Sequence, residues 1–165
     1  MAVGAEVVEI LVVGLPHSGK SQLLDTLNPN HEEEQGWRLT WIQIEDNLQA
    51  RFVEPPSQTA FDFIWTREVI AGADIDGCIV MCDSSRIETF GETVSILETV
   101  RAFHPGLPLV MAANKQDHQQ AWSANDLRLA LGIPDDIRVV SCTASNIDTV
   151  REVVLQLLYD VLGEA

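Results

Sequence analysis

The residues with the clearest chemical potential form a glycine-containing loop near the start of the chain. Residues 14–21 read GLPHSGKS and match the phosphate-binding pattern G-x-x-x-x-G-K-[ST] at every fixed position. Such a loop directs backbone N–H groups at an anion, Lys20 reaches the β- and γ-phosphates, and the Ser21 hydroxyl ligates Mg²⁺. The expected contacts with the phosphates come from Pro16, His17, Ser18, Gly19, Lys20, Ser21 and Gln22.

The segments on either side of this loop bear on whether the match is accidental. An apolar run over residues 7–13 predicts a strand that leads into the loop, and residues 21–27 predict a helix that leaves it. A helix N-terminus favours a bound anion through its dipole and its free N–H groups. A chance glycine turn remains the alternative, and the strand and the helix both disfavour it.

A second polar cluster follows a later apolar run. Residues 109–113 predict a buried strand, and the segment Asn114-Lys115-Gln116-Asp117 comes directly after it in the pattern N-K-x-D. This pattern suits guanine, because the Asp117 carboxylate can accept hydrogen bonds from the ring N1–H and from the exocyclic amine that adenine lacks. The Lys115 stem can lie over the base, and Asn114 can tie this loop to the phosphate loop. A polar turn after a strand is the alternative.

A third loop contributes a weaker signal. The predicted strand at 137–142 leads into Thr143, Ala144 and Ser145. A small residue there lets the Ala144 backbone N–H approach the guanine O6. Small residues after strands are common, so this loop is included because its order and context agree with the two stronger motifs.

Composition restricts the class of protein. The chain has 165 residues, of which 46% are hydrophobic and 21% charged, so we expect one globular domain over 1–165. The net charge of −15 argues against a nucleic-acid partner, since affinity for phosphate backbones depends on Lys and Arg. We find no membrane-spanning run, signal peptide or lipidation motif and expect a cytoplasmic protein without a direct membrane anchor. The cysteines are expected as buried thiols, with a metal site as the alternative: Cys78, Cys82 and Cys142.

The order of the predicted elements indicates how the loops are positioned. Strand-like runs alternate with helical stretches, which predicts a mostly parallel sheet with helices on both faces and ligands at the carboxyl ends of the strands. Runs 37–44 and 48–53, joined by a short turn, predict an antiparallel hairpin. The acidic run from His31 to Glu34 is expected in a solvated loop, with partner contact as the alternative. The other expected elements are strands at 77–82, 107–113 and 137–142, and helices at 61–71, 87–103, 125–131 with Ser123 as N-cap, and 147–162.

With these motifs in this order, the chain resembles a Ras-like small GTPase over nearly its whole length. Segments 61–74, 77–85 and 113–117 further resemble the prokaryotic MglA-type branch of that family. The resemblance implies an α/β, three-layer P-loop NTPase fold with a mostly parallel six-stranded sheet and about five helices. It also implies GTP or GDP binding with Mg²⁺, slow GTP hydrolysis, two mobile switch loops and a protein effector. The MglA-type branch adds a regulator of the roadblock fold.

The second switch departs from the family pattern D-x-x-G. Its slot reads Glu54-Pro55-Pro56-Ser57, followed by Gln58. Glu54 stands where the family's aspartate holds Mg²⁺, usually through water, and its extra methylene can preserve or shift that contact. Ser57 replaces a glycine whose N–H meets the γ-phosphate, and the two prolines stiffen the approach. Gln58 matches the residue that orients the attacking water and is the candidate catalytic residue; an ordinary exposed glutamine is the alternative.

Several other positions have two interpretations. Pro16 replaces a glycine of many relatives, which removes a backbone donor and can crowd Gln58. Thr40, inside the run 37–44, is the candidate Mg²⁺ ligand of the first switch or simply a strand residue. Three arginines could neutralise transition-state charge, with ordinary surface arginine as the alternative: Arg38, Arg51 and Arg67.

Two functional hypotheses follow. The first is a guanine-nucleotide switch that controls a partner protein, with slow hydrolysis lowered further by Pro16 and Ser57. The second is an interaction module that keeps the nucleotide pocket but hydrolyses little or no GTP, as the altered residues 54–57 suggest. A P-loop kinase of small molecules is disfavoured, because no arginine-bearing lid is evident and the guanine motif is present.

Overall fold

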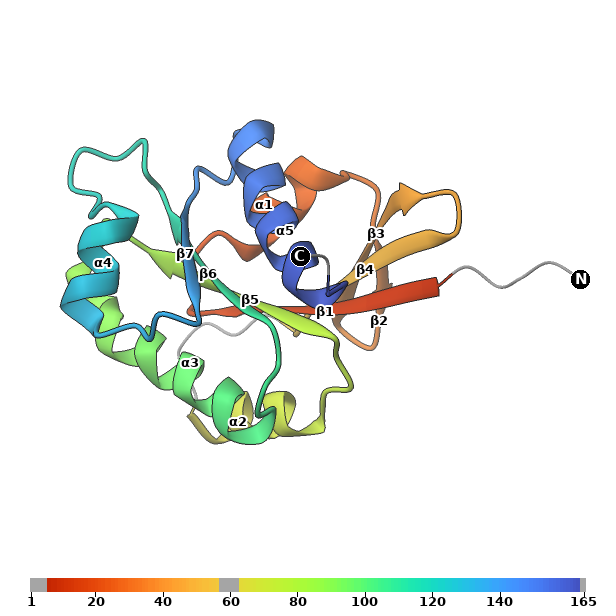
Figure 1. Cartoon of the computed structure of the whole chain (residues 1–165), viewed down its shortest axis with the longest axis horizontal. Coiled ribbons are helices and arrows are strands. Elements are labelled where there is room, and N and C mark those ends of the chain that lie inside the picture. The colour runs from red at the N-terminus through yellow and green to blue at the C-terminus, as the bar shows by residue number, and fades with distance from the viewer. Residues whose placement is uncertain (1–5, 57–62, 164–165) are drawn as a thin grey trace, which may run out of the picture.

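The computed structural model describes residues 6–56 and 63–163, in which a single sheet lies between two helical layers (Figure 1). The strands are β1 (Glu6–Gly14), β2 (Glu32–Glu34), β3 (Trp37–Glu45), β4 (Leu48–Glu54), β5 (Gly77–Asp83), β6 (Leu109–Asn114) and β7 (Arg138–Ser141). Their order across the sheet is β2-β3-β4-β1-β5-β6-β7. β1 pairs in parallel with β4 and β5, and β6 and β7 extend this parallel half.

The predicted sheet is confirmed in its class and corrected in its number of strands. The hairpin of β3 and β4 is antiparallel as expected, but the described residues form seven strands and not six. The extra strand, β2, lies in the acidic run that was predicted as a loop, and it pairs antiparallel with β3. Its three glutamates are all exposed, so an edge position keeps their charges in water while the backbone gains partners. Local composition alone could not show this pairing.

The helices divide between the two faces of the sheet. They are α1 (Lys20–Leu27), α2 (Phe63–Gly72), α3 (Phe90–Phe103), α4 (Ala124–Leu131) and α5 (Ile147–Val161), and a 3-10 turn at Ile87–Thr89 precedes α3. Buried side chains of α1 and α5 share one apolar cluster, and those of α2, α3 and α4 share another. The expected total of about five helices therefore holds for the described residues. Residues 61 and 62 of the expected helix 61–71 lie outside them.

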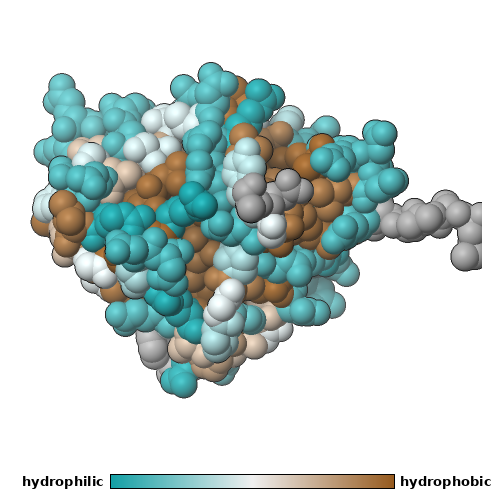
Figure 2. All heavy atoms as spheres, in the orientation of Figure 1, coloured by the Kyte–Doolittle hydropathy of each residue, from teal (hydrophilic) through white to brown (hydrophobic). Residues whose placement is uncertain are grey.

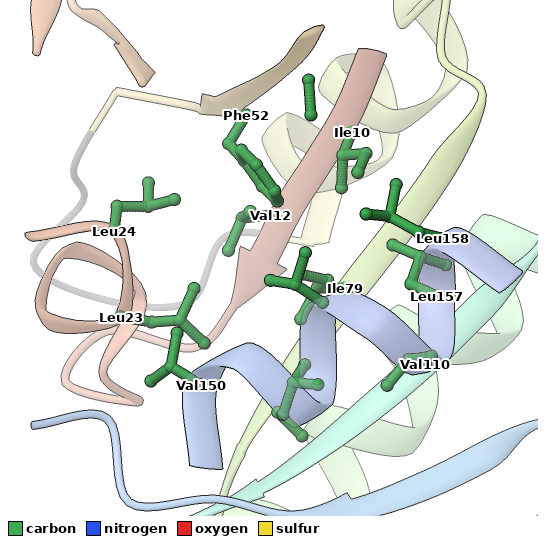
Figure 3. Close-up of a cluster of buried hydrophobic side chains, with 14 of the residues drawn as sticks. Ile10, Val12, Leu23, Leu24, Phe52, Ile79, Val110, Val150, Leu157 and Leu158 are labelled. Carbon is green, nitrogen blue, oxygen red and sulfur yellow. The ribbon is translucent and has the colours of Figure 1, made fainter. Parts of the chain in front are cut away.

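The core on the α1 and α5 face shows how the first strand carries the site. Ile10 and Val12 of β1 point toward Leu23 of α1 and Leu157 of α5, and all four side chains are fully buried (Figure 3). Burying a side chain of this size stabilises the fold by roughly 2 kcal/mol relative to exposure. β1 and α1 are thus held rigidly on both sides of the loop that joins them.

Local capping signals in the sequence are confirmed around α4. The Ser123 hydroxyl accepts a hydrogen bond from the Asp126 N–H at 3.1 Å, as an N-cap does. Gly132 ends the same helix with a left-handed φ of 62°, which a residue with a side chain adopts less readily. The Ser123 cap depends on neighbours within a few residues, which is why the sequence could predict it.

Much of the visible surface is hydrophilic, and the three cysteines lie in the interior. Hydrophilic residues cover much of the face in Figure 2, with hydrophobic residues visible beside the hairpin of β3 and β4. Cys78, Cys82 and Cys142 are free and buried, as predicted, and burial raises the pKa of the Cys82 thiol to about 12 and that of Cys142 to about 11.

Within residues 6–56 and 63–163, no helix has both the length and the apolar character needed to cross a bilayer.

Candidate functional site

The glycine-containing loop joins β1 to α1 at the carboxyl edge of the parallel strands. Gly19 has φ 104°, and a Cβ atom there would collide with the Asn114 side-chain amide. A Cβ atom on Gly14 would lie 2.6 Å from Ser18 Oγ and 2.9 Å from the Met81 carbonyl oxygen. Both glycines of the motif are therefore required by close packing. His17 has a left-handed φ of 67°, which is uncommon for a residue with a side chain.

The first turn of α1 is suited to an anion. Gly19 provides no side-chain cap, so the first backbone N–H groups of the helix are not satisfied by a capping side chain. The Lys20 ammonium donates to the carbonyl oxygens of Gly14 at 2.8 Å and Leu15 at 2.9 Å. Burial lowers the pKa of Lys20, while the charge of Glu54 raises it in part. Uncapped N–H groups and a partly buried ammonium together favour a phosphate ligand.

A serine and a glutamate meet beside this lysine. The Ser21 hydroxyl donates to Glu54 Oε1 at 2.8 Å, and its oxygen lies 3.1 Å from Oε2. Glu54 ends β4 and is 4% exposed, so its carboxylate is almost fully removed from water. Hydroxyl and carboxylate oxygens are the ligand types that Mg²⁺ prefers. The described residues contain no cluster of three or more His, Cys, Asp or Glu side chains suited to a metal, so Mg²⁺ would need phosphate and water oxygens as well.

Asn114 connects three loops that are distant in the sequence. Its side-chain N–H donates to the Ser18 carbonyl oxygen at 2.8 Å, across 96 positions of the chain. Its side-chain carbonyl accepts the backbone N–H of Ala144 at 2.9 Å. The predicted tie between Asn114 and the phosphate loop is confirmed. The Ala144 N–H, however, has a protein acceptor here, whereas the sequence analysis assigned it to the guanine O6.

Asp83 is a residue of this edge that the sequence analysis missed. It ends β5 next to Asn114 on β6, and its side chain is 6% exposed. The Lys115 ammonium donates to Asp83 at 2.9 Å and to the His17 carbonyl oxygen at 2.9 Å. Burial opposes its ionisation, but hydrogen bonds from Ser85 and Lys115 hold the pKa of Asp83 below its ordinary value. A polar residue at the end of a predicted buried strand was the signal available for it.

The other residues predicted to contact the base follow the carboxyl ends of β6 and β7. Asp117 is exposed, in the turn that follows Lys115. Thr143 is half-buried, and its N–H donates to Thr149 Oγ1 at 3.0 Å. The buried Ala144 accepts a hydrogen bond from the Thr26 hydroxyl of α1, and Ser145 is exposed. The loop at 143–145 is thereby fastened to both α1 and Asn114.

The residues expected on the switch side are not all brought together. Thr40 lies inside β3 opposite Phe52, it is fully buried, and its hydroxyl has no partner among the described residues. Ser57 and Gln58 lie outside the described residues. Arg38 is not a surface arginine: its side chain is 13% exposed and pairs with Asp25 of α1, across from Glu54 in the β3–β4 register.

The other two arginines have partners away from this edge. Arg51 pairs with Glu9 and lies 5.5 Å from the Trp41 ring centroid. Arg67 is exposed and lies 5.3 Å from the Phe103 ring centroid. Both contacts are of the cation–π type and account for these side chains without a ligand.

Comparison with known proteins places this geometry in a family. The model of the ADP-ribosylation factor (Arf) family matches residues 2–161. Human ADP-ribosylation factor-like protein 9 is 31% identical over 132 residues, which cover 77% of this chain and 68% of that protein. ADP-ribosylation factor-like protein 6 of Caenorhabditis elegans is 30% identical over 140 residues, with coverage of 79% and 72%.

A solved structure supports the fold independently. The Arl6 BBS3 small GTPase from Trypanosoma brucei, determined with the bound nucleotide analogue GppNp, superimposes with a TM-score of 0.75. The match covers 97% of this chain and 100% of that one, at 19% sequence identity. At this identity the likeness shows a shared fold, and it confirms the predicted Ras-like α/β architecture.

These matches correct one part of the sequence analysis. The relatives are eukaryotic Arf-like proteins, so the prokaryotic MglA-type branch is not supported, and neither is the roadblock-type regulator that depended on it. The assignment rested on segments 61–74, 77–85 and 113–117, of which only the last contains a predicted nucleotide-binding motif. Similarity in these segments identified the larger family but not the branch.

Proposed function

This chain belongs to the ADP-ribosylation factor family, and from that premise we propose that it is a guanine-nucleotide-binding switch that hydrolyses GTP slowly and controls a partner protein. The observation that carries the proposal is the Asn114 side chain, which bonds to the phosphate loop and to the 143–145 loop at once. A nucleotide needs phosphate and base contacts at a set separation, and loops joined in this way provide a preformed site.

The phosphate end of the ligand is assigned to the loop before α1. Pro16 has no backbone N–H, so the loop offers one hydrogen-bond donor fewer to the phosphates. The N–H groups in the first turn of α1 therefore contribute more of the phosphate binding. Lys20 would exchange its two backbone carbonyl partners for phosphate oxygens, which gains charge-assisted hydrogen bonds. The contributing residues are His17, Ser18, Gly19, Lys20, Ser21 and Gln22.

The base end is assigned to the loop after β6. Asp117 would accept from guanine N1–H and the exocyclic amine, and Lys115, held by Asp83, would lay its stem along the ring. Thr143, Ala144 and Ser145 would close the far side of the base. Guanine is preferred over adenine because adenine would leave the Asp117 carboxylate without donors.

Mg²⁺ fits the oxygen atoms that meet near Lys20. We assign the ion to Ser21 and Glu54 and leave out Thr40, which is fully buried inside β3. When bound, the ion neutralises charge that develops on the phosphates during transfer. The protein's own contribution is to orient phosphates through Lys20 and to position water through Gln58. We expect slow hydrolysis because the three candidate arginines, Arg38, Arg51 and Arg67, are engaged by Asp25, Glu9 and the Phe103 ring.

A protein partner is part of the proposal, because a nucleotide switch acts through an effector that distinguishes its GTP-bound form from its GDP-bound form. We also propose that residues 1–165 form one GTPase domain and that the protein acts in the cytoplasm, without a nucleic-acid partner. The low basic content supports the exclusion of nucleic acid.

Nucleotide competition tests the proposed ligand. Nucleotide-free protein with Mg²⁺ is titrated with fluorescent GDP, and unlabelled GTP, GDP or ATP is then added. GTP and GDP should displace the probe at similar concentrations, whereas ATP should require at least about 10³-fold more. ATP acting as well as GDP would overturn the guanine assignment.

The competing function is an interaction module that binds GTP without turnover, and Glu54-Pro55-Pro56-Ser57 motivates it. Phosphate release from a single loading of GTP distinguishes the two, with Gln58→Ala as the matched variant. A wild-type rate above that of Gln58→Ala supports the switch. Equal rates, no faster than GTP in buffer, support the module.

A further inference from the structure

We propose that Glu54 binds Mg²⁺ directly, as a neighbour of Ser21 in the metal's coordination shell, and not through a bridging water. The inference rests on the proposed nucleotide site and names the ligand arrangement within it. Mg²⁺ holds oxygen ligands at 2.0–2.1 Å in octahedral geometry, so two adjacent ligands lie about 2.9 Å apart. Ser21 Oγ lies 2.8 Å from Glu54 Oε1 and 3.1 Å from Oε2. The two groups already have the spacing of adjacent ligands.

The extra methylene of glutamate allows one carboxylate to do two tasks. Both oxygens of Glu54 face the same Ser21 hydroxyl, so one can ligate the ion while the other keeps the hydrogen bond. That bond would orient the hydroxyl with its lone pair toward the metal, as outer contacts of metal ligands commonly do. A shorter aspartate at this position would leave space that a water molecule must fill.

The surroundings of Glu54 leave little freedom for another arrangement. Glu54 is the last residue of β4, paired with Arg38 of β3, and it is followed by the buried Pro55. Its 4% exposure removes it from bulk water, so an intervening water would need a space made for it. Arg38 is engaged by Asp25, which leaves the carboxylate facing Ser21 and the Lys20 side. Phosphate oxygens and waters would complete the shell.

Counting the waters on a bound Mn²⁺ tests this arrangement. Mn²⁺ accepts the same carboxylate, hydroxyl and water ligands as Mg²⁺ and is visible by electron paramagnetic resonance. The full chain is loaded with GDP and Mn²⁺, and line broadening is measured in water enriched in oxygen-17. Wild type should carry one fewer water than Glu54→Asp. Glu54→Gln should weaken Mn²⁺ binding at least about tenfold, since the loss of an outer contact alone has that effect.

Glu98→Gln is the matched control, because it removes an exposed carboxylate of α3, a helix in the other helical layer. It should keep the wild-type water number and Mn²⁺ affinity. Urea unfolding of each variant checks that it is folded. Equal water numbers in wild type and Glu54→Asp, with Mn²⁺ and GDP still bound, would overturn direct ligation and leave the proposed function intact. Failure of the wild type to bind GDP at all would overturn both.

Discussion

The base side and the metal side of the candidate site differ in how their loops are joined. On the base side, side chains of Asn114 and Lys115 bond to the backbone of the phosphate loop, and Asp83 anchors Lys115 from a third strand. On the metal side, one pair, Ser21 and Glu54, joins α1 to the end of β4. The base side is therefore preformed by several buried contacts, whereas the metal side depends on one polar contact next to the altered switch.

This difference suggests that nucleotide binding and the response to GTP hydrolysis depend on different parts of the site. Buried hydrogen bonds that span long stretches of chain join the loops of the base side. The metal side carries the departures from the family pattern, with Glu54 in place of aspartate and two prolines after it. We expect changes on the base side to affect binding and specificity, and changes on the metal side to affect the ion and turnover.

The largest expected effect is on base specificity. Asp117→Asn replaces an acceptor pair by one acceptor and one donor, which suits xanthine with its carbonyl in place of the guanine amine. The ratio of Kd values for xanthosine and guanosine diphosphate should shift by about 10⁴ in favour of xanthine. Competition against fluorescent GDP measures it. An unchanged ratio would mean that Asp117 does not recognise the base. The assignment of specificity to the base side would then be wrong.

Loss of the phosphate-binding ammonium should come next. Lys20→Ala should raise the Kd for GDP at least about 100-fold, because a charge-assisted contact contributes up to about 3 kcal/mol. Calorimetric titration with GDP provides the measurement. Lys20→Arg is the control, since it keeps the charge but not the compact point geometry, and it should recover part of the affinity. Unchanged binding in Lys20→Ala would mean that this loop is not a phosphate site.

Removing the shared tie of the base side should affect stability as well as binding. Asn114→Ala leaves the Ser18 carbonyl and the Ala144 N–H without their partner, so the free energy of unfolding should fall by about 2–4 kcal/mol. Urea denaturation in the absence of nucleotide measures this directly. Gln120→Ala, at an exposed position of the same loop, is the control and should be nearly neutral. A nucleotide-free Asn114→Ala protein as stable as wild type would show that the base side is not preformed.

The smallest effect concerns Asp83. Asp83→Asn should speed GDP release about tenfold by freeing Lys115, which would then be held by the His17 carbonyl alone. Its pKa is lowered in the folded protein, so its stabilising contribution is present above the ordinary carboxyl pKa and is lost as pH falls through the lower folded value. The difference in stability between wild type and Asp83→Asn should therefore shrink from pH 7 toward pH 3. A constant difference would assign Asp83 a packing role only.

The sequence by itself predicted the residues of the candidate site and the order of the elements. The pattern around Lys20, the strand before Asn114 and the cap at Ser123 are encoded within a few residues each, so periodicity and spacing could predict them. The class of the sheet followed from alternating strands and helices, because parallel strands need helical crossovers. The sequence also predicted where the candidate site would lie, since parallel strands present their carboxyl ends on one edge.

Only the tertiary structure decided which side chains meet. The Lys115–Asp83 pair joins residues 32 positions apart, and no local pattern encodes such a contact. The strand pairing of Glu32–Glu34 and the burial of Thr40 inside β3 likewise depend on neighbours brought in by the fold. The physical reason is that hydrogen bonds and burial act through space, whereas residue type and period act along the chain.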